Sequence, residues 1–250
     1  MSISSPVGTV DSIDHGLHRR ARRPVGGLMG NFAALFYVNG SLIDTITGLS
    51  SISYSTATVL IGEGQGYLTG QPAAKVRFDD MSLVSVSTEY LGNRGFESAL
   101  AGSYLTPNVY GNWCNANHWR GSGRFTDIVR TGSYSGGMNK EVGYGTWLHQ
   151  DATLPSIDNC VLQGWVYRSS DTTGSAFQLQ LMLDWDRGGG YASGYVSMSQ
   201  SNSGDVVTSA MGVTHTGFSA TPYDEWVHWR INLFPKGKVP GGWAVGRLAW

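Results

Sequence analysis

Two segments in the C-terminal half of the chain alternate apolar and polar residues. Residues 175–185 and 226–234 both follow this period-two pattern, which places their polar side chains on one face of a β-strand. Amides, a carboxylate and a guanidinium beside aromatic rings suit sugars, because hydroxyl groups need paired hydrogen bonds and pyranose faces stack on rings. A solvated sheet face and a face covered by another subunit are the alternatives. The candidate ligand-binding residues are Gln178, Gln180, Asp184, Tyr195, His228, Arg230 and Asn232.

A pair of adjacent carboxylates, Asp79 and Asp80, follows the alternating segment that contains Val76 and Phe78. Two neighbouring carboxylates at a strand end repel each other unless a cation or hydrogen-bond donors lie between them. Calcium prefers carboxylate and carbonyl oxygens, so the pair is a candidate calcium site. The alternative is that both residues cap a turn in solvent.

The N-terminal segment, residues 1–30, carries four arginines within five positions and shows no helical periodicity. We interpret it as a basic extended arm rather than a domain. Guanidinium groups pair with carboxylates or phosphates, so the arm is expected to anchor the protein on a neighbouring subunit. A solvated, disordered tail is the alternative. The anchoring residues are Arg19, Arg20, Arg22 and Arg23.

Sequence signatures of enzymes are missing from the chain. It has no G-x-S-x-G, H-E-x-x-H or Walker A pattern. A glycosidase needs two carboxylates about 5–9 Å apart on one face, and Glu is rare here. We therefore expect a protein that is not an enzyme.

The elements that position these residues are predicted to be strands. Only 14% of the 250 residues are charged and 35 are glycine, a composition that excludes long helices and favours a β protein rich in turns. Asn39-Gly40 lies between β-forming residues and predicts a hairpin. Further strands are expected over 161–170, 175–185 and 226–234. Turn signals about every ten residues favour a sandwich of two antiparallel sheets.

Charge and cysteine content restrict the partners. The formal net charge is -1, which gives no reason to expect specific nucleic-acid binding. No apolar run is long enough for a membrane span, and the N-terminus does not resemble a Sec signal peptide. We therefore expect cytoplasmic synthesis and a final location on a virion or another extracellular particle. Cys114 and Cys160 are expected to be two buried thiols, with a single disulfide as the alternative.

Several short motifs resemble those of bacterial cellulose- and xylan-binding modules, which are concanavalin-like β-jelly rolls. Asn-Arg-Gly-Phe-Glu at 93–97 is similar to their N-x-G-F-E opening. RTGSYSG at 130–136 is similar to their G-S-Y-S turn, and YDEWVHWRINLF at 223–234 is similar to their W-x-x-W strand. The resemblance implies a structural calcium bound by Glu97, by Asp79 or Asp80, and by backbone carbonyls from Gly132 to Ser135.

The order of the motifs differs from that family. LFYVNG at 35–40 and FDDMSL at 78–83 resemble its closing strands, yet they precede the opening motif. Three explanations stay open: a circularly permuted jelly roll, strands exchanged between neighbouring chains, and a fragment of a tandem array. In each case we expect a single jelly-roll domain over 31–234, in which 31–88 supply the C-terminal-type strands and 89–234 the N-terminal-type strands. A Pro/Gly-rich tail follows at 235–250.

The function predicted from the sequence is that of a structural surface protein of a virus or phage particle, of the decoration or fibre type, whose lectin-like jelly roll also binds glycans. Its expected partners are further copies of itself or other structural subunits, together with a polysaccharide. A free carbohydrate-binding module is the main alternative, and a glycan-active enzyme is a remote one.

Overall fold

The structure of this protein is a computed structural model. The predicted arm lies outside the residues that it describes, and so does the predicted tail apart from Pro235. The described residues are 32–50, 54–62, 74–85, 87–101, 109–115, 121–140, 147–172, 177–184, 192–200, 204–218 and 221–235.

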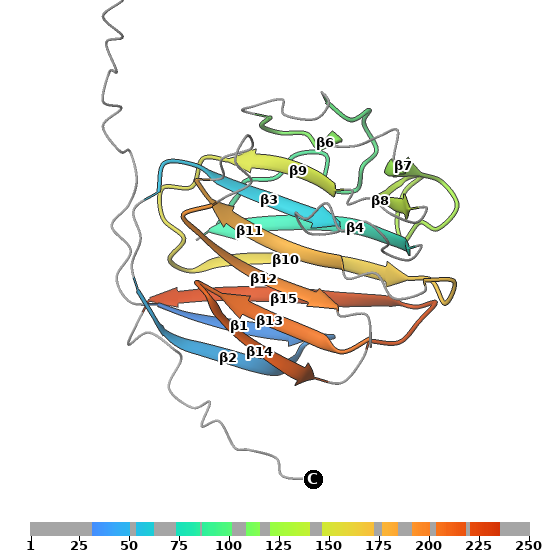
Figure 1. Cartoon of the computed structure of the whole chain (residues 1–250). Coiled ribbons are helices and arrows are strands. Elements are labelled where there is room, and N and C mark those ends of the chain that lie inside the picture. Colours follow the sequence, from blue (N-terminus) through green and yellow to red (C-terminus); the bar gives the residue numbers. More distant parts are fainter. Residues whose placement is uncertain are drawn as a thin grey trace, which may run out of the picture.

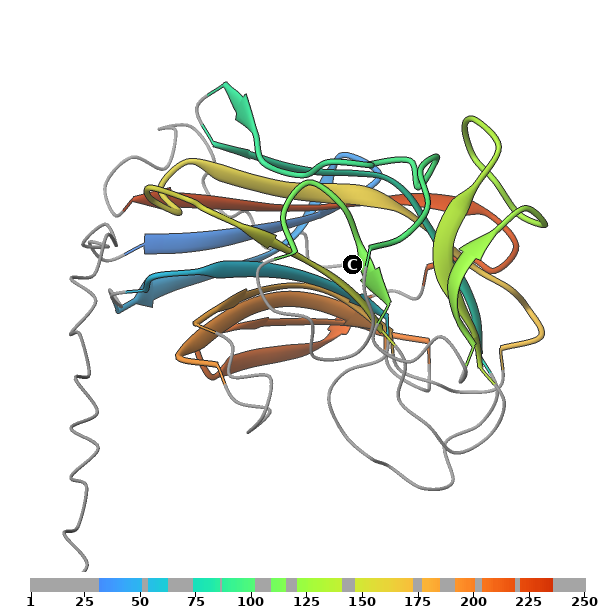
Figure 2. The same cartoon turned by 90° about the horizontal axis from the view of Figure 1, so that it is seen from above.

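In the described part of the chain, fifteen strands form two sheets. The sheets pack face to face, as Figure 1 and Figure 2 show. The first sheet has the order β2-β1-β15-β10-β4-β8-β7, and β5 pairs with β4. Its strands are β1 (Phe32–Val38), β2 (Ser41–Leu49), β4 (Ala74–Ser85), β5 (Thr88–Glu89), β7 (Ser122–Phe125), β8 (Ser135–Lys140), β10 (Cys160–Arg168) and β15 (Trp226–Pro235).

The second sheet has seven strands in the order β14-β13-β12-β11-β3-β9-β6. Strand pairing is antiparallel in both sheets, so the predicted all-β sandwich of two antiparallel sheets is confirmed. The strands of this sheet are β3 (Ala57–Gly62), β6 (Cys114–Asn115), β9 (Trp147–Ala152), β11 (Phe177–Leu183), β12 (Gly194–Gln200), β13 (Val206–Ala210) and β14 (Val213–Phe218).

The hairpin predicted at Asn39-Gly40 joins β1 and β2. Both residues have positive φ, 48° and 80°, as a type I′ turn requires. Val38 pairs with Ser41 across this turn. The turn therefore fixes the start of the register between β1 and β2.

Alternation along the strands builds the core between the sheets. On β15, the side chains of Val227, Trp229, Ile231 and Leu233 are buried, as the period-two pattern predicts. Trp229 stacks on Phe177 of β11 in the opposite sheet, with ring centroids 5.4 Å apart. Burial of such side chains supplies most of the stabilisation in a sandwich of this kind.

Strands from the two halves of the chain alternate within both sheets. β1 pairs with β15, β4 lies between β10 and β8, and β3 lies between β11 and β9. In this structure these pairings form within one chain, and one hydrophobic cluster includes residues from both halves. Circular permutation of a family order stays a prediction.

The join between the halves is fixed by a buried amide. Gln150 of β9 accepts a hydrogen bond from the Gly92 N–H at 2.7 Å and donates one to the Gly92 carbonyl at 3.1 Å.

Both cysteines are buried thiols, and burial raises the pKa of Cys160 to about 11. In the described part of the chain, no helix has the length and apolarity needed to cross a bilayer.

Candidate functional site

The seven predicted ligand-binding residues do not form one face. Gln178, Gln180 and Asp184 belong to β11 or its end and Tyr195 to β12, all in the seven-stranded sheet. The other three are on β15 in the eight-stranded sheet. Because the two sheets bury their apolar faces against each other, their polar faces point in opposite directions. The prediction of one shared face is therefore wrong.

Three of these residues have structural contacts or are buried. The Asp184 carboxylate accepts hydrogen bonds from the backbone N–H groups of Ser55 and Thr56 at 2.7 and 2.9 Å, so it orders the start of β3. Asn232 is 5% exposed and its side-chain oxygen accepts a hydrogen bond from Arg230 Nε at 2.6 Å. Gln180 is also buried. Gln180 and Asn232 are therefore not available to a ligand at the surface, and Asp184 serves to order the chain before β3.

The outer face of the eight-stranded sheet gathers aromatic, amide and cationic side chains. Along β10, buried residues alternate with half-buried ones, and β15 follows the same alternation for most of its length. Cross-strand pairing places Gln163 opposite Arg230, Trp165 opposite His228, and Tyr167 opposite Trp226. We call this surface the aromatic face; it consists of Tyr37, Gln163, Trp165, Tyr167, Trp226, His228 and Arg230.

A chain of ring contacts crosses the aromatic face. The Arg130 guanidinium lies 3.8 Å from the centre of the Trp165 ring, and its Nη1 donates a hydrogen bond to Asp80 at 2.5 Å. On the other side, the Trp165 and His228 ring centres are 5.0 Å apart. Cation–π contacts of this kind hold flat groups at the surface of the sheet. Trp165 thus lies half-buried on the outer face of the sheet.

His228 lies between two arginines. Burial lowers the pKa of His228, and the positive charges of Arg230 and Arg130 lower it further. The imidazole therefore remains neutral to lower pH than an ordinary histidine with a pKa of about 6.5. The pKa of His228 is lower in the folded state than in the unfolded state. The neutral imidazole therefore contributes to the stability of the fold at pH values above the pKa of the unfolded state. That contribution is lost as the pH falls through the ordinary value toward the folded one.

Replacement of Arg230 by glutamine is expected to raise the pKa of His228 toward its ordinary value, because one of the two neighbouring positive charges is removed. An NMR titration of the histidine ring signals measures this directly. Arg124→Gln is the control, since Arg124 lies on β7 at the far edge of the sheet and stacks on Tyr134. Equal shifts in the two variants would contradict the assignment.

The second candidate site brings two carboxylates and the side-chain stem of Glu97 near Gly95. A β-carbon on Gly95 would lie 3.5 Å from Asp79 Oδ1, 3.9 Å from Asp80 Oδ1 and 4.0 Å from Glu97 Cγ. We call Asp79, Asp80 and Glu97 the carboxylate cluster. The residues that the sequence linked through the calcium prediction therefore do come together in space.

Backbone donors occupy the Asp79 carboxylate. Asp79 is fully buried, and it accepts hydrogen bonds from the N–H groups of Asp80, Arg130 and Thr131 at 2.8–3.1 Å. Burial raises the pKa of Asp79, and these donors lower it without cancelling the effect of burial. The side chain therefore fixes the loop before β8 from inside the protein.

Glu97 binds the same loop at its other end. Its Oε1 accepts hydrogen bonds from the Ser133 and Tyr134 N–H groups at 2.9 and 3.2 Å. A β-carbon on Gly132 would lie 2.2 Å from this oxygen, so the contact requires glycine at that position. The Ser135 hydroxyl donates to the Ile128 carbonyl at 2.7 Å.

This donor set does not fit calcium held by the loop carbonyls. In a planar trans peptide the carbonyl points opposite to the N–H of the next residue, so the carbonyls of Gly132 and Ser133 point away from Glu97. Among the described residues, no three His, Cys, Asp or Glu side chains are placed to hold one metal ion. Calcium stays a prediction of the family resemblance.

A buried arginine that the sequence analysis missed holds the neighbouring loop. Arg77 of β4 is fully buried, and its Nε and Nη2 donate to the two carboxylate oxygens of Asp127 at 3.0 and 2.9 Å. Burial raises the pKa of Asp127, but Lys75 and Arg77 outweigh this effect and the net pKa is lowered. The only signal in the sequence was a charged residue between the apolar Val76 and Phe78.

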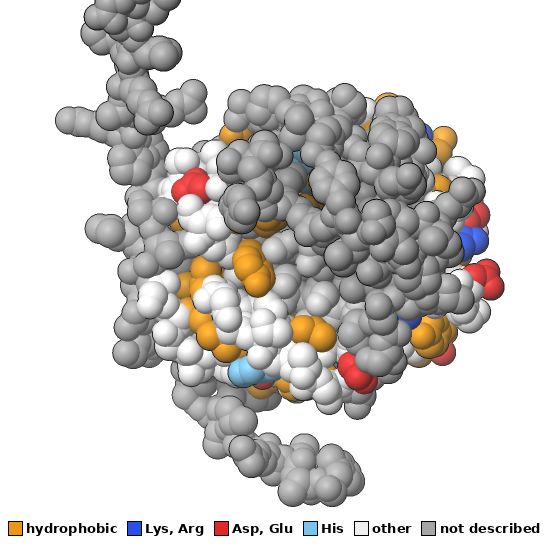
Figure 3. Space-filling view, in the orientation of Figure 1, with side chains coloured by type: hydrophobic (Ala, Val, Ile, Leu, Met, Phe, Trp, Pro, Cys, Tyr) orange, Lys and Arg blue, Asp and Glu red, His pale blue; other side chains and the backbone are white. Residues whose placement is uncertain are grey.

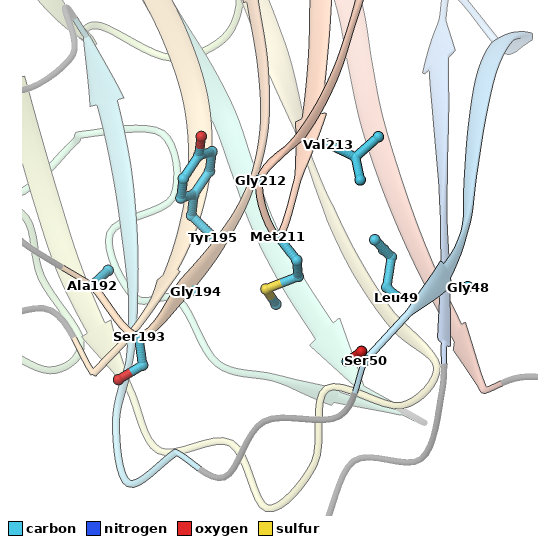
Figure 4. A pocket seen from close by; sticks show the side chains of 10 residues that line it. All are labelled: Gly48, Leu49, Ser50, Ala192, Ser193, Gly194, Tyr195, Met211, Gly212 and Val213. Carbon is cyan, nitrogen blue, oxygen red and sulfur yellow. The ribbon is translucent and has the colours of Figure 1, made fainter.

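A hollow of about 480 Å³ lies at the lateral edge of the sandwich, between the end of β2 and the turn from β13 to β14. Figure 4 shows that Leu49, Met211 and Val213 line it together with Tyr195. Figure 3 shows the face of the molecule on which β12, β13 and β14 lie. On this face, most of the charged side chains that the structure describes lie near the rim. The described lining supplies apolar surface and hydroxyl groups rather than acid–base pairs.

The comparisons with known proteins add no family to this description. No family model, no curated protein and no solved structure matches the chain.

Proposed function

We propose that the protein is a non-enzymatic, lectin-like surface protein that binds glycans on the aromatic face. The observation that carries the proposal is the cross-strand register of β10 and β15, which sets Trp165 beside His228 and Gln163 beside Arg230. Rings offer flat apolar surface to pyranose faces, while the amide and the guanidinium offer hydrogen bonds to hydroxyl groups.

The carboxylates of the cluster support a function without catalysis. Asp79 and Glu97 accept hydrogen bonds from backbone N–H groups, and Asp80 pairs with Arg130. Carboxylates used in this way order loops and are poorly placed to exchange protons with a substrate.

Glycan binding is tested by a glycan array followed by titration of the best ligand. Trp165→Ala is expected to lower the affinity about tenfold or more, because the proposed site loses the ring that positions Arg130 and His228. Arg230→Gln is expected to weaken binding as well, since the amide presents fewer donors than the guanidinium.

The matched control is Gln178→Ala, a polar residue on the outer face of the opposite sheet. Its affinity is expected to equal that of the wild type. If Gln178→Ala loses binding while Trp165→Ala does not, the ligand lies on the seven-stranded sheet and the proposal is wrong. Circular dichroism of each variant verifies that the fold is retained.

The setting that we propose for this protein is the surface of a virus or phage particle, with the basic arm as its anchor. This part of the proposal rests on the four arginines of residues 1–30, which lie outside the described residues. The mass of the native species separates the alternatives. A large particle or fibre supports the structural role, and a monomer of about 26.9 kDa supports a free carbohydrate-binding module. Deletion of residues 2–24 is expected to abolish assembly while the β fold persists.

A further inference from the structure

A second buried arginine, Arg168 at the end of β10, differs from Arg77 in its partners. Both side chains are almost completely buried, at 2% and 0% exposure. Arg77 binds a carboxylate and two backbone carbonyls. In the part of the chain that the structure describes, no carboxylate or backbone carbonyl accepts a hydrogen bond from the Arg168 guanidinium, and its polar contact is with the Tyr223 side chain.

The acidic residue Asp224, whose backbone contacts Arg168, does not pair with its guanidinium. The backbone N–H of Asp224 binds the Arg168 carbonyl at 2.8 Å, but the Asp224 carboxylate accepts the Tyr167 hydroxyl and the Ser170 N–H. The contact that Arg168 does make is with an aromatic ring: its Cζ lies 4.4 Å from the centre of the Tyr223 ring. Burial lowers the pKa of Arg168, and Tyr223 offsets this only in part.

An unpaired charge in this place is unfavourable. A buried guanidinium does not lose its proton at ordinary pH, so its charge and its five donors require compensation. The planar fork of donors matches the paired oxygens of a carboxylate or a phosphate. Tyr223 is 42% exposed, so the ring that contacts Arg168 also borders solvent.

We propose that Arg168 is an anion-binding residue, which holds an oxyanion of the carboxylate or phosphate type beside Tyr223. The oxyanion comes either from solution or from an acidic side chain of a second copy of this chain. This site faces the interior at the end of the sandwich, so it is distinct from the aromatic face, where β10 presents Trp165 and Tyr167. It does not depend on glycan binding.

The test compares thermal unfolding of the wild type and Arg168→Met in phosphate, in acetate and in chloride at equal ionic strength. At a hundredfold excess over its dissociation constant, the oxyanion is expected to raise the melting temperature of the wild type by about 5–10 °C relative to chloride. Arg168→Met is expected to show no such rise. In chloride, it should be as stable as the wild type or more stable, because an uncompensated charge has been removed.

Arg77→Met is the matched control, since Arg77 already has its carboxylate. It should be destabilised to the same extent in all three buffers. A rise that grows with protein concentration, together with a doubled mass, supports a carboxylate from a second copy; a rise that depends only on the added oxyanion supports a free ion. If Arg168→Met is destabilised equally in every buffer, or if the wild type does not distinguish oxyanion from chloride, the proposal is wrong.

Discussion

Replacement of Trp229 by alanine is expected to lower the free energy of unfolding by about 3–5 kcal/mol. The indole is completely buried between the sheets and stacks on Phe177 at 5.4 Å with an interplanar angle of 13°. Its N–H has no hydrogen-bond partner among the described residues, so the loss comes from packing and from the cavity left behind. Chemical denaturation followed by circular dichroism measures the change.

Trp226→Ala is the control for this prediction, because it removes the same side chain from the same strand but from the outer face. Trp226 is only half-buried and contacts Tyr167 at 5.6 Å. We expect its substitution to cost clearly less than that of Trp229. Equal costs would mean that the inner and outer faces of β15 had been assigned incorrectly.

Replacement of Asp79 by alanine is expected to destabilise the protein by about 3 kcal/mol or more. Three backbone N–H groups lose their acceptor, and each unsatisfied buried donor costs about 1–3 kcal/mol. Hydrogen exchange should show loss of protection at Arg130 and Thr131 before the global transition. Asp80→Ala is the control, since the Asp80 side chain is 32% exposed and its ion pair with Arg130 is a surface contact. A destabilisation of Asp80→Ala as large as that of Asp79→Ala would argue against the role of the buried acceptor.

A chelator and the variant Glu97→Ala decide whether calcium contributes to the carboxylate cluster. If the family resemblance extends to a bound ion, a chelator lowers the melting temperature of the metal-analysed wild type, and Glu97→Ala abolishes that sensitivity. An unchanged melting temperature leaves the backbone N–H groups and Arg130 as the groups that compensate these charges.

The sequence by itself determined several of the strands and the apolar residues that they turn inward. Asn39-Gly40 specifies a turn with positive φ at both positions, and the alternation in β10, β11 and β15 identifies the inward residues. These signals are local, because a strand has a period of two residues whatever its neighbours are. The short motifs also placed Asp79 and Glu97 in one cluster, although 18 positions separate them in the chain.

Only the tertiary structure decided which strands share a sheet. His228 and Gln178 look alike in the sequence, since both are polar residues on alternating strands, yet they lie on opposite faces of the molecule. The register that joins Trp165 to His228 involves residues 63 positions apart, and no local pattern encodes such a pairing. The same holds for the groups that compensate buried charges. Arg77 meets Asp127 while Arg168 meets only a ring, because long-range packing determines which groups surround each side chain.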